Sequence, residues 1–370
     1  MDDEELVGFD ALYEAMWKCK RGTIWKNPVA GYVLHGIEET LKLEEKLKTG
    51  KYKSGKTNKF ILTYPKVREC VSICFRDRIY QRSLNDNAIY PQVTKHFIWD
   101  NMACQRRKGT DKAMDRLERF LHEYYRKNKT NEGYVLQGDI EHYYASMTHK
   151  SAKDTFREYV DDVPYKRAEV ILDNQYDGDR GYNPGSQMIQ IAGISVPNKT
   201  DHKIKEAKGE RHYLRYMDDF IIIHDNYEYL EEMREIFTEE LKKIDLKLHP
   251  KKTRIYPLAD GILFLGFTFK LTQTGKVIRL INPQNVKHER KRLRRMVAKA
   301  KRGEMTKAKV DECYNAWKAH AKRGNTWKLL KRMDNYYNQL WRNDYESNQK
   351  LNADQRKSGI KTGTGTGREK

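Results

Sequence analysis

The sequence predicts an α+β fold in which an antiparallel sheet is interleaved with helices, followed by a basic helical region. Two short strand-like runs, 213–216 and 220–223, flank a turn and so predict a hairpin. A third apolar run, 134–138, is separated from them by stretches of helical pattern. Strands and helices in this order indicate a split βαβ sheet. Beyond residue 284 the pattern becomes helical, and residues 287–302 hold nine Lys and Arg against one Glu.

The chain is strongly basic. Its 370 residues include 72 Lys and Arg against 52 Asp and Glu, a net charge of +20. Such a charge favours a polyanionic partner, nucleic acid first. The 24 Tyr and 6 Trp supply faces on which bases stack. On charge alone, a highly charged protein without a nucleic-acid role stays open as the alternative.

The sequence shows no signal typical of membrane proteins, secreted proteins or proteins with a CxxC motif. No apolar run approaches the ~18 residues of a membrane span, so no membrane partner is expected. The acidic start, MDDEELVGFD, does not resemble a signal peptide. The five cysteines (Cys19, Cys70, Cys74, Cys104 and Cys313) form no CxxC pair. They are predicted to be reduced core thiols of a cytoplasmic protein.

The first elements of the chain are helices over residues 5–48. Residues 50–57, GKYKSGKT, match the P-loop pattern G-x-x-x-x-G-K-[ST]. A P-loop follows a buried strand and opens a helix, whereas here a charged helix precedes and a strand-like run, 60–65, follows. We therefore predict a flexible basic turn. Lys66 and Arg68 come next, on one face of an extended segment, which suits a triphosphate or a solvated strand edge.

The middle and the end of the chain alternate strands with helices. A helix is predicted over 150–172, and a Gly/Pro loop within 178–196 leads into an apolar helix. Residues 241–256 read as a helix-to-strand run that contains Lys252. Residues 261–269 are strand-like, and 272–275 form a hairpin turn.

Three carboxylates stand out. Asp218 and Asp219 lie between the runs of the predicted hairpin, and Asp139 ends the 134–138 run. Two negative charges on a tight turn are costly unless a cation binds there, and Mg²⁺ prefers carboxylate oxygens. An ordinary Asp-Asp turn is the alternative. Two-metal phosphoryl transfer needs such a cluster around ions ~4 Å apart, and the predicted sheet places all three carboxylates on one edge.

Several motifs occur in an order that resembles one known family. YMDD (216–219) resembles a YxDD box, and GDIEHYY (138–144) resembles the family's first carboxylate motif. NPGSQMIQ (183–190) follows the G-x-x-x-S-P/Q element, LHPKKT (248–253) the L-x-x-x-K-T element and FLGF (264–267) the primer-grip hairpin. Over about 60–345 the chain resembles a reverse transcriptase of the bacterial and phage type. The resemblance implies a right-hand polymerase with fingers, palm and α-helical thumb.

The resemblance also implies a division of the chain into parts. Residues 1–58 would be an N-terminal helical extension and 59–135 the fingers. Residues 136–280 would be the palm, with 150–190 returning to the fingers. Residues 281–350 would be a basic helical thumb that tracks template–primer phosphates, and 351–370 a disordered tail.

Residue roles follow from the matched positions. Asp139 and Asp218 would bind two Mg²⁺ ions, supported by Asp219 and by Ile140; Mn²⁺ is the substitute ion. Tyr144 falls on the steric-gate position and predicts dNTPs over rNTPs, a core aromatic being the alternative. The resemblance further implies that Lys66 and Arg68 hold the triphosphate. It implies that Gln187 and Gln190 flank the nucleotide pocket, and that Lys252 protonates the leaving pyrophosphate. A charge at a helix C-terminus is the alternative for Lys252.

The function implied is an RNA-directed DNA polymerase that copies an RNA template onto a DNA primer. Pro184 before the motif glycine, and Ile189-Gln190 where Ser-Pro or Ser-Gln is usual, depart from intron and retron enzymes. Met217 in the YMDD box and Gln190 resemble instead the residues found in the enzymes of diversity-generating retroelements. The pattern resembles unclassified prokaryotic reverse transcriptases, many implicated in antiphage defence. We expect no nuclease domain after the thumb, and hence a cognate noncoding RNA or an accessory protein as partner. A catalytically silent RNA-binding scaffold is the remaining alternative.

Overall fold

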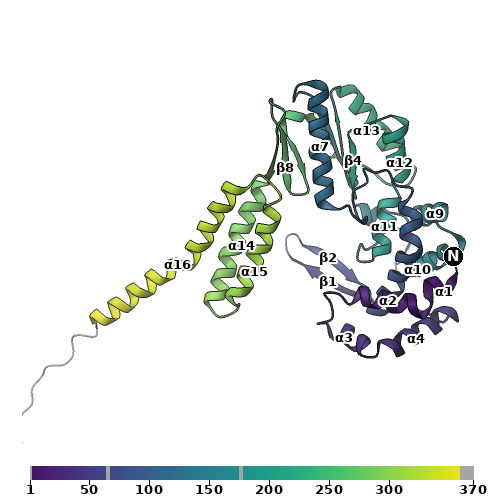
Figure 1. Cartoon of the computed structure of the whole chain (residues 1–370), viewed down its shortest axis with the longest axis horizontal. Helices are drawn as coiled ribbons and strands as arrows, with labels where there is room; N and C mark the ends of the chain where they lie inside the picture. Colours follow the sequence, from purple (N-terminus) through teal and green to yellow (C-terminus); the bar gives the residue numbers. More distant parts are fainter. Residues whose placement is uncertain (1, 64–66, 175–177, 359–370) are drawn as a thin grey trace, which may run out of the picture. The chain divides into compact units, whose positions relative to one another are not determined.

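The computed structural model describes residues 2–63, 67–174 and 178–358. The chain divides into two compact units, Met1–Ala259 and Asp260–Lys370. Each unit contains both helices and antiparallel strands (Figure 1). The predicted α+β class is therefore confirmed.

Four helices open the first unit: α1 (Asp3–Val7), α2 (Phe9–Cys19), α3 (Asn27–Leu34) and α4 (Gly36–Lys48). The buried face of α2 consists of Leu12, Ala15, Met16 and Cys19, the i, i+3, i+4, i+7 spacing of an amphipathic helix. This face packs against α4 and α5 (Phe75–Leu84). The predicted helical stretch is confirmed, with breaks at Gly8, over residues 20–26 and at His35.

The P-loop-like segment lies between α4 and strand β1 (Asn58–Leu62), which pairs antiparallel with β2 (Arg68–Ser72). Residues 51–57 have no regular structure. The Tyr52 hydroxyl donates to one carboxylate oxygen of Asp77 at 2.7 Å, and the Gly55 N–H donates to the other at 2.8 Å. A helix before and a strand after confirm that this is not a P-loop, and buried Asp77 of α5 holds the turn.

The main sheet has four strands in the order β4-β5-β3-β6. All neighbours are antiparallel. The strands are β3 (Tyr134–Asp139), β4 (Tyr213–Tyr216), β5 (Asp219–His224) and β6 (Arg254–Pro257). Helices join the first strand to the second and the third to the fourth, which is the β-α-β-β-α-β arrangement of a split βαβ sheet. That prediction is confirmed.

Helices fill the connections around this sheet. Two short π-helical turns, η1 (Asn85–Ile89) and η2 (Lys203–Ala207), and a 3₁₀ turn, η3 (Leu258–Asp260), interrupt them. The remaining helices of the unit are α6 (Tyr90–Thr94), α7 (Thr110–Asn128), α8 (Tyr143–Ser146), α9 (His149–Tyr159), α10 (Asp162–Asn174), α11 (Gln187–Ser195), α12 (Asn198–His202) and α13 (Tyr227–Lys242).

The sheet is buried on both faces. Residues 220–223 of β5 are all fully buried, and successive side chains of a strand point to opposite faces. Helix α13 packs on β3, β5 and β6, while α7 packs on β4 and β5. The Phe220 and Phe237 rings stack with centroids 4.0 Å apart. The hairpin that carries the Asp pair is thus built into the core of the unit.

The second unit joins a three-stranded sheet, β7-β8-β9, to three helices. Its elements are β7 (Ile262–Phe264), β8 (Phe267–Leu271), β9 (Val277–Ile281), α14 (Pro283–Lys301), α15 (Lys307–Ala321) and α16 (Trp327–Ser358). Asn282 caps α14, its side chain accepting from the Gln284 N–H at 2.9 Å. Gly303, with φ of +78°, follows the end of α14, where a left-handed conformation favours glycine. Residues 351–358 of the predicted disordered tail belong to α16, so the prediction is wrong for them, and residues 359–370 lie outside the described residues.

Residues 261–269 form two strands, not one. Leu265 and Gly266 have φ of +49° and +87°, as a two-residue hairpin turn requires, and they separate β7 from β8. The apolar run hid this turn because Leu265 is an unusual residue for a left-handed position. The predicted turn at 272–275 is confirmed: the Thr272 N–H donates to the Lys276 carbonyl at 2.9 Å.

The predictions about membrane spans and about the cysteines can also be compared with the structure. Among the helices that the structure describes, none offers the apolar length that crossing a bilayer needs. All five thiols are free: Cys19 is buried, Cys70, Cys74 and Cys313 are partly buried, and Cys104 is exposed. The prediction of core thiols is therefore wrong for Cys104, which lies in the Gly-containing loop before α7.

Candidate active site

Strand pairing brings the three predicted carboxylates to one edge of the main sheet. Asp139, at the end of β3, is the Cα partner of Asp219 at the start of β5. Tyr216 also pairs with Asp219, so Met217 and Asp218 form a two-residue turn. The Ile140 N–H donates to the Asp218 carbonyl at 3.1 Å. Asp139, Ile140, Asp218 and Asp219 are thus neighbours, as the sequence predicted.

A buried arginine holds this turn. Arg215 of β4 is fully buried. Its guanidinium donates to the two carboxylate oxygens of Asp201 at 2.7 and 2.5 Å. It also donates to the Met217 carbonyl at 2.9 Å and to the Ile194 carbonyl at 2.8 Å. Met217 has φ of +58°, a left-handed conformation that costs ~1–2 kcal/mol for a residue other than glycine, so the turn needs an anchor.

The carboxyl groups at the edge destabilise one another's charge. Burial, and then the neighbouring Asp139, raise the pKa of Asp218. Burial, with the charges of Asp218 and Asp139 adding to it, raises the pKa of Asp219 to about 7. A cation bound at this edge would favour the charged forms.

Lys252 supplies one such cation. Its ammonium nitrogen lies 3.0 Å from each carboxylate oxygen of Asp139. The Lys252 side chain is 58% exposed and that of Asp139 is 12% exposed. Lys252 lies in the turn after His249, whose N–H donates to the Asp139 carbonyl at 2.8 Å. Because α13 already ends at Lys242, the alternative of a charge at a helix C-terminus is wrong.

The donor set fits a divalent metal ion. Carboxylate and backbone oxygens are the ligands that Mg²⁺ prefers. As placed, the described residues contain no group of three or more His, Cys, Asp or Glu arranged to hold a metal. In this arrangement the Lys252 ammonium pairs with the Asp139 carboxylate. Metal binding would exchange this ammonium for an ion of higher charge.

Tyr144 lies against the Met217 turn. Its hydroxyl oxygen is 4.0 Å from the Met217 sulfur. A Cβ at position 193 would lie 2.9 Å from the same hydroxyl, so Gly193 of α11 makes room for the ring. The Tyr144 side chain is half-buried, and burial raises the pKa of its phenol well above the usual value. Neighbouring Tyr143 is buried and occupies the core.

Gln190 and Cys104 face the same turn. The Cys104 sulfur lies 4.0 Å from the Met217 sulfur and 3.7 Å from the Gln190 side-chain oxygen. The Gln190 amide donates to the Pro184 carbonyl at 2.9 Å. The structure thus gathers Tyr144, Gln190, Met217 and Cys104, whereas Gln187 lies one turn away, at the first position of α11.

Gln187 and Gln190 also line a basic pocket of about 340 Å³ between α2, α5 and the start of α11. Its cations are Lys18, Arg21, Arg78 and Arg82, and among the residues that the structure describes no acidic one lines it. Lys18 and Arg82 pair with Asp86 at 3.4 and 2.7 Å. The side chains of Arg21 and Arg78 have no ion pair with any residue described. The pocket therefore favours an anionic group.

The predicted triphosphate clamp is only partly described. Lys66 lies outside the described residues. Arg68 opens β2 opposite Leu62 and is exposed. Within the described ranges, no hydrogen bond or ion pair holds its guanidinium. The clamp role of both residues stays a prediction.

Sequence reasoning missed Arg215, Asp201, Gly193 and Cys104. Arg215 did leave a signal: a charged residue inside the strand Tyr-Leu-Arg-Tyr, next to the Asp pair. A charge at a buried strand position requires a buried partner. Asp201 is that partner, but nothing in the sequence distinguishes it from other acids.

Replacing Arg215 tests its anchoring role. Arg215→Met leaves Asp201 buried without a partner, so we expect unfolding to become easier by roughly 3–5 kcal/mol, measured by urea denaturation. Arg215→Met/Asp201→Leu removes both charges and should recover most of this stability. The double variant should still bind Mg²⁺ more weakly in calorimetry, because the Met217 carbonyl has lost its donor. Unchanged Mg²⁺ affinity would contradict the anchoring role.

Asp219→Asn tests the electrostatics of the edge. A carboxyl with a raised folded-state pKa binds its proton more tightly when folded, so wild-type stability falls as pH rises toward about 7. We expect the Asn variant to melt above the wild type at pH 8 in EDTA and at the same temperature at pH 3. Mg²⁺ should raise the wild-type melting temperature at pH 8 by more than it raises that of the variant. Equal melting curves at both pH values would refute the raised pKa.

Comparisons with known proteins identify the family. A profile of the family described as "Reverse transcriptase (RNA-dependent DNA polymerase)" matches residues 65–269, and no curated protein sequence matches the chain. Among solved structures, the chain is similar to apo telomerase from Candida tropicalis truncated from its C-terminal domain, at 15% identity and TM-score 0.46, over 66% of this chain and 60% of that one. It is also similar to telomerase from Candida albicans in complex with a TWJ fragment of telomeric RNA, at 10% identity and TM-score 0.43, over 66% of this chain and 48% of that one. The chain thus spans 48–60% of the length of these two structures. The family match covers more than half of the 370 residues, and the chain belongs to the reverse transcriptase family.

Proposed function

We propose that the chain is an RNA-directed DNA polymerase that extends a DNA primer with dNTPs on an RNA template. The observation that carries this proposal is the meeting of Asp139, Asp218 and Asp219 at one edge of the sheet, within the matched family domain. The raised pKa values of Asp218 and Asp219 support a cation-binding role. A nucleotidyl transfer is the reaction that such an edge suits best.

Asp139 and Asp218 would hold two Mg²⁺ ions, with Asp219 and the Ile140 carbonyl as supporting oxygens and Mn²⁺ as a substitute ion. Bound divalent ions would lower the pKa of the primer 3′-hydroxyl and neutralise the triphosphate. The hairpin turn fixes the relative position of the carboxylates, because Arg215 holds the Met217 carbonyl. This rigidity keeps the groups that bind metal in one geometry before substrate arrives.

Lys252 would have two roles, one before metal binding and one during the reaction. Paired with Asp139, its ammonium compensates the buried carboxylate in the absence of metal. Displaced from Asp139, this long and exposed side chain is free to donate a proton to the leaving pyrophosphate. Lys66 and Arg68 would hold the triphosphate, and Gln187 and Gln190 would flank the nucleotide.

Template binding would use the basic pocket beside α11. Arg21 and Arg78 line it without ion pairs among the described residues, and Gln190 contacts Cys104, whose sulfur lies 4.0 Å from the Met217 sulfur. A backbone phosphate of the template suits this pocket. The N-terminal helix α2 supplies Lys18, so the extension 1–58 would act together with the fingers.

The parts of the hand would be fingers (59–135 with 150–190), palm (136–280) and thumb (281–350). Helix α14 contains residues 287–301 of the basic run, with Arg302 as its C-cap, and would track template–primer phosphates.

The biological role we propose is antiphage defence, with a cognate noncoding RNA as template and an accessory protein as a further partner in the cytoplasm. Pro184 and the Ile189-Gln190 pair, which depart from intron and retron patterns, motivate this assignment. A diversity-generating retroelement enzyme is the second candidate, favoured by Met217 in the YMDD box. A template repeat and a variable repeat beside the gene would decide for the second candidate. A silent RNA-binding scaffold is the third, and the complete carboxylate set argues against it.

Primer extension tests the enzymatic proposal. With an RNA template, a DNA primer, dNTPs and Mg²⁺, we expect Asp218→Asn/Asp219→Asn to extend more than ~100-fold more slowly than the wild type, since groups that merely orient metal ligands are already worth ~10–100-fold. The matched control is Asp225→Asn/Glu228→Gln, which changes two exposed acids just after β5. Equal rates for all three proteins would reject catalysis and favour the scaffold.

Tyr144 is proposed to exclude ribonucleotides by colliding with the 2′-hydroxyl. Tyr144→Ala should lower the preference for dNTP over rNTP in kcat/KM at least ~10-fold, because a lost steric contact of this size is worth ~1–3 kcal/mol. Tyr144→Phe keeps the ring and serves as the control that should retain the preference. An Ala variant that discriminates like the wild type would mean that Tyr144 is not the gate.

A further inference from the structure

The second unit contains a pocket of about 670 Å³ between its sheet and its helices. Strands β8 and β9, the start of α14 and the start of α16 form its walls. The apolar lining comes from six side chains: Leu280, Ile281, Pro283, Val286, Leu329 and Met333. A volume of this size accommodates a planar ring, and the apolar lining favours desolvating one.

Four cations stand around this apolar lining. Lys270, Arg290, Lys328 and Arg332 all line the pocket and are exposed, and none of the described residues that line it is acidic. Arg290 stacks its guanidinium 4.4 Å from the centre of the Tyr336 ring. The other three cations have no hydrogen bond or ion pair to the part of the chain that the structure describes. The rim therefore presents uncompensated positive charge.

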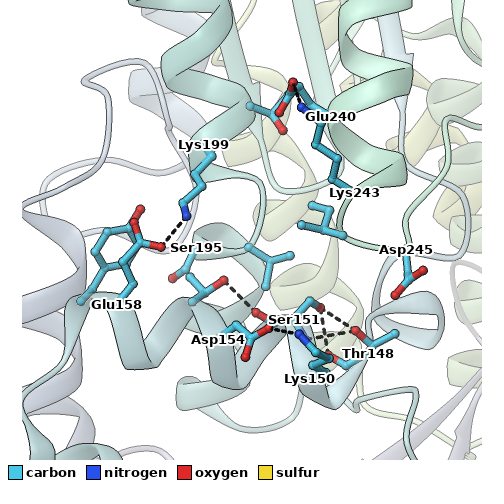
Figure 2. Close-up of a pocket in the computed structure, with 15 residues that line it drawn as sticks. Thr148, Lys150, Ser151, Asp154, Glu158, Ser195, Lys199, Glu240, Lys243 and Asp245 are labelled. Atoms are coloured by element: carbon cyan, nitrogen blue, oxygen red, sulfur yellow. Dashed lines mark hydrogen bonds and ion pairs between the residues drawn. The ribbon is translucent and has the colours of Figure 1, made fainter.

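A pocket in the first unit shows the opposite pattern. Its cations pair with carboxylates from the same lining: Lys150 with Asp154 at 2.5 Å, Lys199 with Glu158 at 2.6 Å and Lys243 with Glu240 at 2.7 Å (Figure 2). In that pocket, carboxylates neutralise these three lysines, so the lining does not favour an anionic ligand. The two pockets therefore differ: the three lysines of this first-unit pocket are paired with carboxylates, whereas Lys270, Lys328 and Arg332 are not paired with any residue that the structure describes.

The walls of the pocket in the second unit are fixed. Asn325 makes two hydrogen bonds to the Arg279 backbone, one from its N–H and one to its side-chain oxygen, both 2.7 Å. A Cβ at Gly324 would lie 2.7 Å from the Arg279 carbonyl, so this close approach requires glycine. The loop before α16 is thereby fastened to β9. A binding site with fixed walls loses little entropy when a ligand enters.

An exposed indole lies next to the rim. Trp327, the residue before Lys328, is 73% exposed. The Lys331 ammonium lies 5.7 Å from the centre of its ring. Exposed aromatic rings beside cations form stacking platforms for the bases of single-stranded nucleic acid.

We propose that this pocket of the second unit receives an unpaired base of single-stranded RNA, while Lys270, Lys328 and Arg332 hold the flanking phosphates. The net charge of this unit favours a nucleic acid over a protein as the partner. Residues 260–370 carry 27 Lys and Arg against 10 Asp and Glu, whereas residues 1–259 carry 45 Lys and Arg against 42 Asp and Glu. Trp327 offers a stacking face for the next base. The site goes beyond the proposed polymerase function, because it needs neither metal nor dNTP and reads an unpaired base instead of a duplex.

Binding of two matched probes tests the pocket in the full chain. One probe is a single-stranded 12-mer of oligouridine RNA, and the other is its abasic counterpart with the same phosphates. We expect the wild type to prefer the base-containing probe by about tenfold, because stacking one base is worth that order. Leu280→Glu places a charge in the pocket and should remove most of this preference. The control, Leu263→Glu, makes the same change at a similarly exposed leucine of the same sheet, 45% against 40%, and should keep it.

Salt dependence tests the rim. Lys270→Gln/Arg332→Gln should lower the slope of log affinity against log salt by ~1.4, about 0.7 for each lost phosphate contact. Lys309→Gln/Lys322→Gln, two exposed lysines outside the pocket, is the matched control and should lower the slope less. All binding is measured in EDTA without dNTPs, so the outcome is independent of primer extension.

Three outcomes would overturn the proposal. Equal affinity of the wild type for both probes would mean that phosphates alone are bound. Equal loss of preference in the two leucine variants would place base recognition elsewhere. Displacement of both probes by an acidic amphipathic peptide, without any base preference, would identify the pocket as a protein-docking site.

Discussion

The buried ion pair between Arg215 and Asp201 is the contact on which the carboxylate edge depends. Removing two charges from water costs several kcal/mol per ion, so such a pair is weak evidence for stability by itself. Here the guanidinium also donates to the carbonyls of Met217 and Ile194. It therefore joins the hairpin turn to the end of α11 and to α12. A lysine has a single ammonium and no planar fork with which to make these contacts together.

The same edge is electrostatically unfavourable without a cation. Strand pairing sets Asp139 opposite Asp219, and like charges directly opposite each other destabilise a sheet. The pKa of about 7 at Asp219 and the ammonium of Lys252 on Asp139 are two responses to this repulsion. One response neutralises a carboxyl with a proton and the other compensates it with a side chain. A site that stabilised its own charge completely would have less affinity left for a metal ion.

The local patterns of the sequence were sufficient to predict the hairpin, the end of β3 and the split sheet. The apolar run 220–223 predicts a strand that is buried on both faces. Because the two charged Asp side chains beside it are costly to bury, the turn at the end of the strand is the expected place for them. Arg215 escaped prediction because its partner, Asp201, is defined only by packing α12 against the sheet. The apolar run 261–269 hid the β7–β8 turn, because Leu265 adopts a left-handed conformation that its side chain disfavours. Only the resemblance of FLGF (264–267) to a primer-grip hairpin indicated that turn. Cys104 was assigned to the core on residue type, although its loop brings it to the surface beside Met217.

Charge also divides the chain unevenly, and this has a physical consequence for α14. Nearly all of the net charge of +20 comes from residues 260–370, and residues 287–302 within them hold nine Lys and Arg against one Glu. Like charges three and four residues apart destabilise a helix. Burial of Leu293, Met296 and Val297 offsets that repulsion. A polyanion lying along the helix would remove the repulsion without disturbing the buried face, so nucleic acid should stabilise this unit as well as bind it.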